Sequence, residues 1–298
     1  MKLDVSLFLC SSVYLGPQSS GLNKRKQQEF FTHQYPTWLL KRPRLIHLIY
    51  VLNYLLQLRK WHITGRLNKL LSSKNKPFYL LDAGCGEAQF LFPYAAQYCE
   101  SYFKGIDRGH ANIAFCNSYI KDRSLTHVSF EEMEMEQLKE KEIYDIVLCI
   151  SVLPYSKNDR LALTCLHHAM KTGAELLLYV PVNQTIILPF YKKILQRYEN
   201  YETIQQNQRV YTEQGLKLLL QDTDFKVVET KNTYGFFGKL SNELLNSHLI
   251  LFNAYAFPFK IILSISLLIS YPLILICMIL DYTLPVRSGN GLMVLARK

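Results

Sequence analysis

The stretch from Phe78 to Phe90 constrains the fold more than any other part of the chain. It reads Phe-Tyr-Leu-Leu-Asp-Ala-Gly-Cys-Gly-Glu-Ala-Gln-Phe. The apolar start predicts a buried strand that stops at Asp82, and Gly84 and Gly86 predict a tight turn into a helix that begins near Glu87. Glycines let a ligand approach the main chain closely, and free N–H groups at a helix start favour a negatively charged group. The stretch predicts a cradle for a small ligand, although similar turns also occur for backbone reasons alone.

Short apolar runs alternate with helical stretches after this turn. This order is typical of a parallel sheet with helices on both faces. Helices are predicted over Glu87–Tyr98 and about Thr212–Leu220, and further strands over Tyr102–Ile106, Val128–Phe130, Ile146–Ile150, Glu175–Val180 and Phe225–Thr230. In such sheets the ligand lies beyond the carboxyl ends of the strands. Asp107 closes the second strand, so it is placed to accept hydrogen bonds from two ribose hydroxyls, or to cap a helix.

The order of these motifs resembles the class I S-adenosylmethionine-dependent methyltransferases. The resemblance covers roughly Lys76 to Asn232 plus the last ten residues, and it implies a three-layer α/β Rossmann-like sheet. That sheet is mostly parallel, and Gly291–Arg297 would form an antiparallel last strand beside the fifth. The residues that carry the resemblance are Leu80–Gly86, Gly105–Asp107, Val128–Phe130 with Glu134 and Leu138, Tyr144–Cys149 with Ser151–Leu153, and Thr172–Leu178.

The resemblance implies that S-adenosylmethionine is the methyl donor, and it assigns residues to it. The glycine loop would receive the methionine part with Asp82 near the amine, Asp107 would hold the ribose, Met133 and Glu134 would flank the adenine, and Ser151 to Leu153 would face the methyl group. The implied donor-binding residues are Asp82, Ala83, Gly84, Cys85, Gly86, Asp107, Arg108, Met133, Glu134, Ser151, Val152 and Leu153.

The chain departs from the family pattern in two places and differs from a competing one. Ala88 stands where a third glycine is often found, and Glu134 stands where an aspartate is usual in the adenine loop. A nicotinamide cofactor would need glycine at position 89, where the chain has Gln89. The sequence therefore favours the methyl donor.

No catalytic residue is assigned from the sequence. A sulfonium methyl is already activated, so holding the acceptor in line can supply much of the acceleration. A general base is needed only for a neutral hydroxyl acceptor, and the candidates are His110, the pair His167–His168, which we favour as structural, and His33, His47 and His62 from a possible cap. We expect no metal site, because the seven cysteines form no Cys-x-x-Cys pair and suit structural roles in a reducing compartment.

The positive charge of the chain is concentrated before the glycine loop. Apolar residues at 49% and charged residues at 19% exclude general disorder. Between Gly21 and Lys76 there are twelve Lys or Arg and a single acid, Glu29, whereas the rest of the chain has 22 basic and 23 acidic residues. The net charge of +10 is therefore a property of the amino-terminal region.

Part of that region, residues 42 to 60, predicts one helix that is apolar around nearly its whole circumference. Asn53, Gln57 and Lys60 leave only a narrow polar stripe, and basic residues cluster at both ends. The helix is either a core helix or one that lies at an anionic membrane surface. Nucleic-acid binding is not expected, because the interleaved polar and aromatic face is missing. The first fifteen residues do not read as a signal peptide, so we expect a cytoplasmic protein.

A second apolar region lies just before the last predicted strand. Ile261 to Leu280 contains twenty residues without a charge, which is about 30 Å of helix and enough to span a bilayer. A single span would separate Gly291–Arg297 from its sheet. The chain must return on one side, through a break at Pro272 or with a partner in Leu244–Phe259, or this region stays out of lipid as a lid or dimer face.

These observations divide the chain into four segments and predict its function. The segments are a helical amino-terminal region or cap (1–76), the donor-binding core (77–232), the apolar helical insertion (233–287) and the last strand (288–298). We expect methyl transfer to a small or lipid-like acceptor, favoured at oxygen, by a peripheral or monotopic protein at a cytoplasmic membrane face. Two alternatives are a soluble methyltransferase with a hydrophobic lid and a membrane-associated donor-binding protein without catalysis. The acceptor and the oligomeric state are not encoded in any recognisable pattern.

Overall fold

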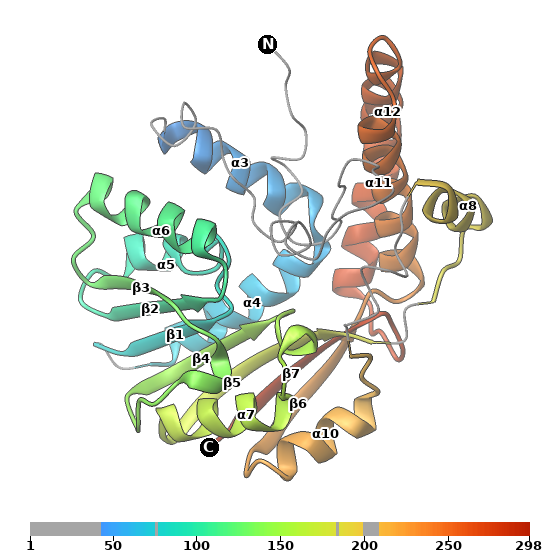
Figure 1. Ribbon diagram of the computed structural model, residues 1–298. Helices are drawn as coiled ribbons and strands as arrows, with labels where there is room; N and C mark the ends of the chain where they lie inside the picture. Colours follow the sequence, from blue (N-terminus) through green and yellow to red (C-terminus); the bar gives the residue numbers. More distant parts are fainter. Residues whose placement is uncertain (1–42, 75–76, 183–184, 199–208) are drawn as a thin grey trace.

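A seven-stranded sheet forms the centre of the molecule (Figure 1). The computed structural model describes residues 43–74, 77–182, 185–198 and 209–298. The strand order is β3-β2-β1-β4-β5-β7-β6, built from β1 (Tyr79–Ala83), β2 (Tyr102–Asp107), β3 (Val128–Glu132), β4 (Tyr144–Ile150), β5 (Met170–Pro181), β6 (Lys226–Thr233) and β7 (Gly291–Arg297). The first five strands pair in parallel, and β7 runs antiparallel to both β5 and β6. The predicted Rossmann-like sheet with an antiparallel last strand is confirmed.

Several strands are longer than the apolar runs that predicted them. The first continues through Asp82 to Ala83, and the fifth begins at Met170 and not at Glu175. Met170 pairs with Tyr144, and the ladder then shifts register before Ile146. Lys171, Thr172 and Gly173 are partly or fully exposed and do not form an apolar run, so the criterion of apolar runs misses the start of this strand.

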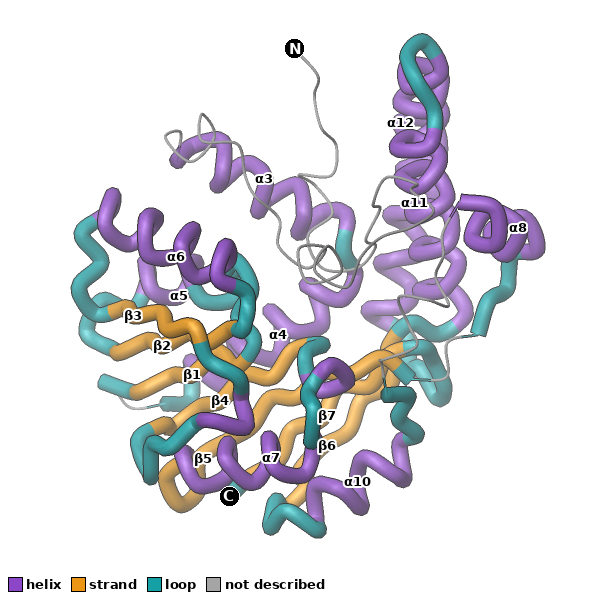
Figure 2. Tube along the Cα trace, viewed as in Figure 1, coloured by secondary structure: helices purple, strands orange, loops and turns teal. Residues whose placement is uncertain are grey.

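Helices cover both faces of the sheet (Figures 1 and 2). One face packs against α4 (Leu58–Ser72), α5 (Phe92–Gln97) and α6 (His110–Arg123), and the other packs against α7 (Asp159–Ala169), α10 (Glu213–Gln221) and the short helices η2 (Met135–Gln137) and η3 (Leu153–Tyr155). β1 and β4 are buried along almost their whole length, as expected for parallel strands covered on both sides.

The helix predicted over Glu87–Tyr98 is wrong in its first half. Residues 87 to 91 form turns, and α5 begins only at Phe92. Ala88 has a φ of 55°, which is incompatible with a right-handed helix. Pro93 lies in the first turn of α5, where its missing N–H is no loss.

The single helix predicted over residues 42–60 is also wrong, because the chain bends at Gln57. That residue is extended, with φ −119° and ψ 102°, and separates α3 (Pro43–Leu56) from α4. α4 buries Ile63 and Leu67 against the sheet, whereas α3 leaves Leu48 and Val51 exposed. The two helices leave the bend in different directions (Figure 1).

The apolar insertion is a pair of helices that projects from the sheet (Figure 1). α11 (Phe236–Ala254) follows β6, and α12 (Phe259–Thr283) leads back to β7. α12 continues through Pro272, so of the two ways in which the chain could return, a break at Pro272 does not occur. α11, which includes most of Leu244–Phe259, packs against α12 as its partner. Because β6 and β7 are neighbours, both ends of this helical hairpin lie at the same edge of the sheet.

A buried aspartate fixes the base of the hairpin. Asp281 is 2% exposed, and its carboxylate accepts hydrogen bonds from the backbone N–H groups of Tyr234 (3.1 Å) and Gly238 (3.0 Å). A Cβ at Gly238 would lie 2.6 Å from that carboxylate, so the contact requires glycine. His62 Nε2 of α4 lies 3.6 Å from the carboxylate oxygen that accepts from Tyr234. Asp281 thereby joins α11 and α12 to α4.

Candidate donor-binding site

The loops that follow β1, β2 and β3 meet at the carboxyl edge of the sheet. The N–H groups of Gly84 and Cys85 both donate to the carbonyl of Ile106, at 2.8 and 2.9 Å. The N–H of Met133 donates to the carbonyl of Asp107 at 3.0 Å. Backbone hydrogen bonds therefore link the glycine loop, the loop that begins at Asp107 and the predicted adenine loop.

The two glycines of the loop serve different purposes. Gly84 has a φ of +79°, and a Cβ there would lie 2.3 Å from the side chain of Val152. Gly86 has a φ of +54°, and a Cβ there would meet no atom within 4 Å. Gly84 is thus required by packing against the loop after β4, while Gly86 borders open space that a ligand can fill. Ala88 keeps a left-handed backbone at φ 55°, so this departure from the family pattern preserves a conformation that favours glycine.

Asp107 organises the loops around it through three hydrogen bonds. One carboxylate oxygen accepts from the N–H of Gly86 at 2.9 Å. The other accepts from the N–H of Gly109 at 2.7 Å and from the Asn112 amide at 3.2 Å. An ionised carboxylate has about four acceptor positions, so room remains for a donor hydroxyl. The predicted ribose contact stays a prediction.

Asp82 is a buried acid with an unsatisfied oxygen. It is 2% exposed, and its Oδ2 has no hydrogen-bond partner among the described residues. Burial raises the pKa of this carboxyl to about 7, and the nearby charge of Asp107 adds to the increase. A buried carboxylate is stable only when a partner compensates its charge. The site therefore fits a ligand that brings a cationic group, such as the amine of the methionine part of S-adenosylmethionine.

The remaining predicted contacts lie farther out on the same edge. Glu134 forms an ion pair with Lys157 at 2.7 Å, and an Arg108 guanidinium nitrogen lies 3.5 Å from the carbonyl of Tyr155. Both interactions involve exposed groups. Their predicted roles beside the adenine and the ribose remain predictions.

Arg59 is a residue of this edge that sequence reasoning missed. It is 7% exposed, and its guanidinium donates to the Ser151 hydroxyl at 2.8 Å. Its backbone N–H donates to the Tyr234 hydroxyl at 3.0 Å. Ser151 was predicted to face the methyl group, so α4 adds a buried positive charge beside that position. Nothing in the sequence separates Arg59 from the other basic residues before the loop.

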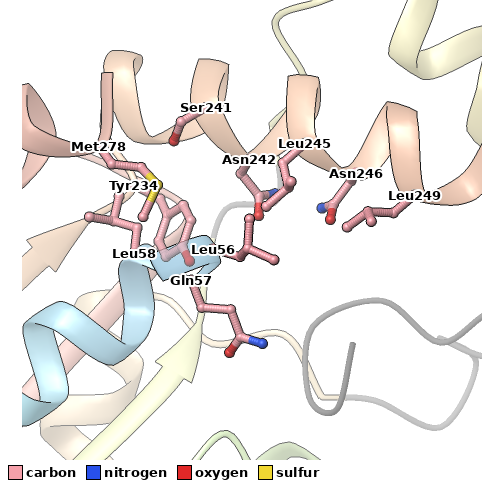
Figure 3. A pocket seen from close by; sticks show the side chains of 10 residues that line it. All are labelled: Leu56, Gln57, Leu58, Tyr234, Ser241, Asn242, Leu245, Asn246, Leu249 and Met278. Atoms are coloured by element: carbon pink, nitrogen blue, oxygen red, sulfur yellow. The ribbon is translucent and has the colours of Figure 1, made fainter. Parts of the chain in front are cut away.

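Tyrosine hydroxyls gather near Arg59. Burial raises the pKa values of Tyr155, Tyr179 and Tyr234, and the charge of Arg59 opposes the increase in each case. Tyr234 also borders a cavity between the α3–α4 bend and α11 (Figure 3). That cavity has a volume of about 20 Å³, which is room for about one water molecule. It is too small to hold an acceptor in this conformation.

The candidate histidines are dispersed. The His110 side chain is 85% exposed and pairs with Glu132 at 2.7 Å. His167 packs edge-on against Phe225, with ring centroids 5.0 Å apart, and His62 faces Asp281. His33 and the side chain of His47 lie outside the described part of the chain. The general base, if the reaction uses one, stays unassigned.

The chain belongs to the methyltransferase-domain family. The family model described as "Methyltransferase domain" matches residues 74–238, which is more than half of the 298 residues. The expected membership of a methyltransferase family is confirmed. The matched range, residues 74–238, includes the glycine loop, Asp107 and the loop after β4.

Curated relatives match part of the chain. It is 25% identical over 166 residues to a ubiquinone biosynthesis O-methyltransferase of Rickettsia akari (strain Hartford), which covers 53% of this chain and 60% of that protein. It is also 25% identical over 146 residues to the protein of the same name from Rickettsia felis (strain ATCC VR-1525 / URRWXCal2), covering 47% and 53%. The chain thus spans about three fifths of the length of the first of these relatives.

Solved structures share the fold at low sequence identity. The chain is similar to Haemonchus contortus phosphoethanolamine N-methyltransferase 2 in complex with S-adenosyl-L-methionine, with a TM-score of 0.56 and 14% identity over 87% of this chain and 59% of that one. It is also similar to the [4+2]-cyclase SpnF, with a TM-score of 0.51 and 16% identity over 78% and 80% of the two chains. Because one neighbour is a cyclase, the fold alone does not fix the reaction.

Proposed function

We propose that this protein transfers a methyl group from S-adenosylmethionine to the oxygen of a small, lipid-like acceptor. The observation that carries the proposal is the unsatisfied Asp82 carboxylate near the end of β1, together with the open space at Gly86 in the loop that follows. The family supports methyl transfer, and the similarity to ubiquinone biosynthesis O-methyltransferases supports oxygen as the accepting atom.

The bound donor would supply an electrophilic methyl group on a sulfonium, and the residues of the chain would supply alignment. Asp82 would hold the donor amine, and Asp107 would hold the ribose while fixing Gly86. Arg59 and Ser151 would border the space that the acceptor enters. Positioning of this kind accounts for large rate effects without a dedicated catalytic group.

Two measurements test the proposal. Calorimetric titration with S-adenosylmethionine should show binding, and its absence at sub-millimolar donor would disprove the central claim. Transfer of a labelled methyl group from the donor should then be followed into a lipid extract and into an aqueous extract, with base-stable ether product expected in the lipid phase. Donor binding without transfer into either extract would favour the second candidate, a donor-binding protein without catalysis.

We also propose that the α11–α12 hairpin attaches the protein to a membrane from one side. α12 is the one helix among the described residues that is long and apolar enough to cross a membrane. Its 25 residues measure about 37 Å, and only 17% of its most apolar window is buried. The side chains of Leu268 and Ile269 are each 74% exposed. Exposed apolar surface of this extent is typical of a lipid or protein contact.

Several polar side chains of the hairpin find hydrogen-bond partners within it. The Ser264 hydroxyl donates to the carbonyl of Lys260 at 2.8 Å. His248 is bonded through one ring nitrogen to the Leu244 carbonyl at 2.8 Å and through the other to the Ser266 hydroxyl at 3.0 Å. Polar groups in lipid must find partners inside the protein, and these groups do so. This supports lipid over water as the surroundings of the distal hairpin.

The connection of the hairpin favours a monotopic arrangement. Both of its ends join neighbouring strands of one sheet, so the chain enters and leaves on the same side, which we propose is the cytoplasmic face. Cell fractionation tests this: the protein should stay with membranes in low salt and dissolve with detergent. Full solubility without detergent would reject the attachment and favour a soluble enzyme with a hydrophobic lid.

A further inference from the structure

Helix α8 (Pro189–Tyr198) is held firmly against the outer side of the hairpin. Tyr191 and Leu195, each 7% exposed, pack on Ile250 of α11. The buried carboxylate of Glu243 accepts hydrogen bonds from the N–H groups that precede the helix, at 2.9 and 2.7 Å. Figure 1 shows α8 beside the hairpin and below its tip. Its position relative to the hairpin is therefore fixed.

α8 is an amphipathic helix whose outer face is basic. Lys192, Lys193 and Arg197 are exposed, and the helix contains no acid. The two lysines form no ion pair with any residue in the described part of the chain. Phe190, at the start of the helix, is 46% exposed. Basic residues with an exposed aromatic ring are typical of helices that lie in the headgroup layer of a membrane.

The level of α8 divides the hairpin into a distal and a proximal part. α8 contacts α11 at Ile250. His248, two residues earlier on α11, bonds to Ser266 of α12. We therefore take Ser266 as the residue of α12 at the level of α8. From Phe259 to Ser266 the helix rises about 10 Å. This distal part carries the most exposed ring of the hairpin, Phe257 at 75%, and a single charge, Lys260, whose ammonium lies over the Phe252 ring at 4.8 Å.

We propose that the basic face of α8 docks on anionic lipid headgroups and limits how deeply the hairpin enters the membrane. Lysines near an anionic surface are attracted to it. Charged side chains inside the hydrocarbon region are costly, and the three on α8 would cost more there than the single Lys260 of the distal part. The headgroup layer therefore holds α8 together with Leu268 and Ile269, which lie within about 5 Å of Ser266 along α12. Only the distal part of the hairpin passes beyond this layer. The resulting depth of about 10 Å agrees with that of interfacial elements. The inference rests on the proposed membrane attachment.

Vesicle flotation tests the choice of lipid. The full chain is bound to vesicles of phosphatidylcholine alone and to vesicles with phosphatidylglycerol, and the double variant K192Q/K193Q is compared with K139Q/K141Q. The control pair is also exposed but lies before β4, away from the hairpin. Removal of two headgroup contacts should weaken binding to the anionic vesicles roughly 30-fold, and the control pair should bind like the parent.

The outcomes separate this inference from the attachment itself. Equal binding of the parent to neutral and anionic vesicles, with no loss in K192Q/K193Q, would overturn the role of α8 and leave the hairpin attachment standing. Equal losses in both double variants would also overturn it, because the effect would then be one of net charge. A parent that binds neither kind of vesicle would reject the attachment and this inference together.

Depth-dependent quenching tests the limit on insertion. Tryptophan is introduced at Ile262, in the distal part, or at Leu273, about 10 Å from Ser266 in the other direction. Both positions are more than half exposed. Bromine atoms placed deep in the acyl chains should quench the added emission of I262W and leave that of L273W unchanged. Equal quenching of the two would show that α8 sets no limit.

Discussion

Two buried aspartates, one in the donor site and one at the base of the hairpin, differ in how their charge is compensated. Each is 2% exposed. Asp281 accepts hydrogen bonds from two backbone N–H groups and faces His62, whereas Asp82 has an oxygen with no partner among the described residues. From this difference we predict that Asp281 stabilises the fold and that Asp82 binds a ligand. Substitutions at the two positions should therefore affect different measurements.

The largest expected effect is that of Asp281→Ala. Loss of the carboxylate leaves the N–H groups of Tyr234 and Gly238 unsatisfied and opens a gap between α4, α11 and α12. We expect the free energy of unfolding to fall by about 3 to 5 kcal/mol, measured by denaturant titration in detergent. The variant that remains folded should bind S-adenosylmethionine with unchanged affinity. A loss of donor affinity with no loss of stability would reverse the assignment of Asp281.

Asp107→Ala should lower both the stability of the protein and its affinity for the donor. This acid accepts hydrogen bonds from the loops around it and is predicted to hold the ribose. Each charge-assisted hydrogen bond is worth about 1.5 to 3 kcal/mol, so donor binding should weaken by several kcal/mol at most. Calorimetric titration measures it, and Asn112→Ala is the matched control because it removes one of the internal bonds without touching the predicted ribose contact. Unchanged affinity in Asp107→Ala would show the ribose assignment to be wrong.

Asp82→Asn should separate stability from binding most clearly. The folded-state pKa of this acid is raised from 3.8 to about 7, so its contribution to stability is present below pH 3.8 and is lost as the pH rises towards 7. At pH 8 the neutral asparagine should therefore raise the stability of the donor-free protein, by on the order of 2 kcal/mol. Thermal unfolding measures this gain, and donor affinity should fall in the same variant.

The pH dependence of donor binding also tests whether Asp82 binds the donor amine. If the ionised carboxylate holds the donor amine, affinity should rise roughly tenfold between pH 6 and pH 8, as the fraction of ionised Asp82 increases. Asp82→Asn should bind weakly and show no such rise. A parallel rise in the variant would assign the titration to another group.

The sequence predicted the candidate donor site more completely than the rest of the molecule. The resemblance implied a mostly parallel sheet with an antiparallel last strand, and it placed Gly86 and Asp107 at one edge, because parallel strands bring their carboxyl ends to the same edge. It did not predict that Arg59 reaches Ser151, since those residues are 92 positions apart and no pattern connects them. The bend at Gln57 was also missed, because it depends on how α4 packs against the sheet.

The apolar insertion was likewise only partly predictable from the sequence. Composition identified an apolar helix but left open whether Pro272 breaks it, and packing against α11 decides in favour of a continuous helix. Proline within a helix is tolerated when neighbouring groups accommodate it. Tertiary contacts of this kind have no local signature.

The smallest expected effect distinguishes the two glycines of the loop. Gly86→Ala places a methyl group in open space at a φ of +54°, so stability should fall by only about 1 to 2 kcal/mol from backbone strain. Donor affinity should nevertheless drop, because the new methyl group occupies the proposed cradle. Gly84→Ala is the matched comparison: its Cβ would lie 2.3 Å from Val152, so the fold itself should be more strongly destabilised. Thermal unfolding with and without donor measures both variants. If Gly86→Ala keeps full donor-induced stabilisation, the open side of Gly86 is not where the methionine part binds, and the unsatisfied oxygen of Asp82 would need another ligand.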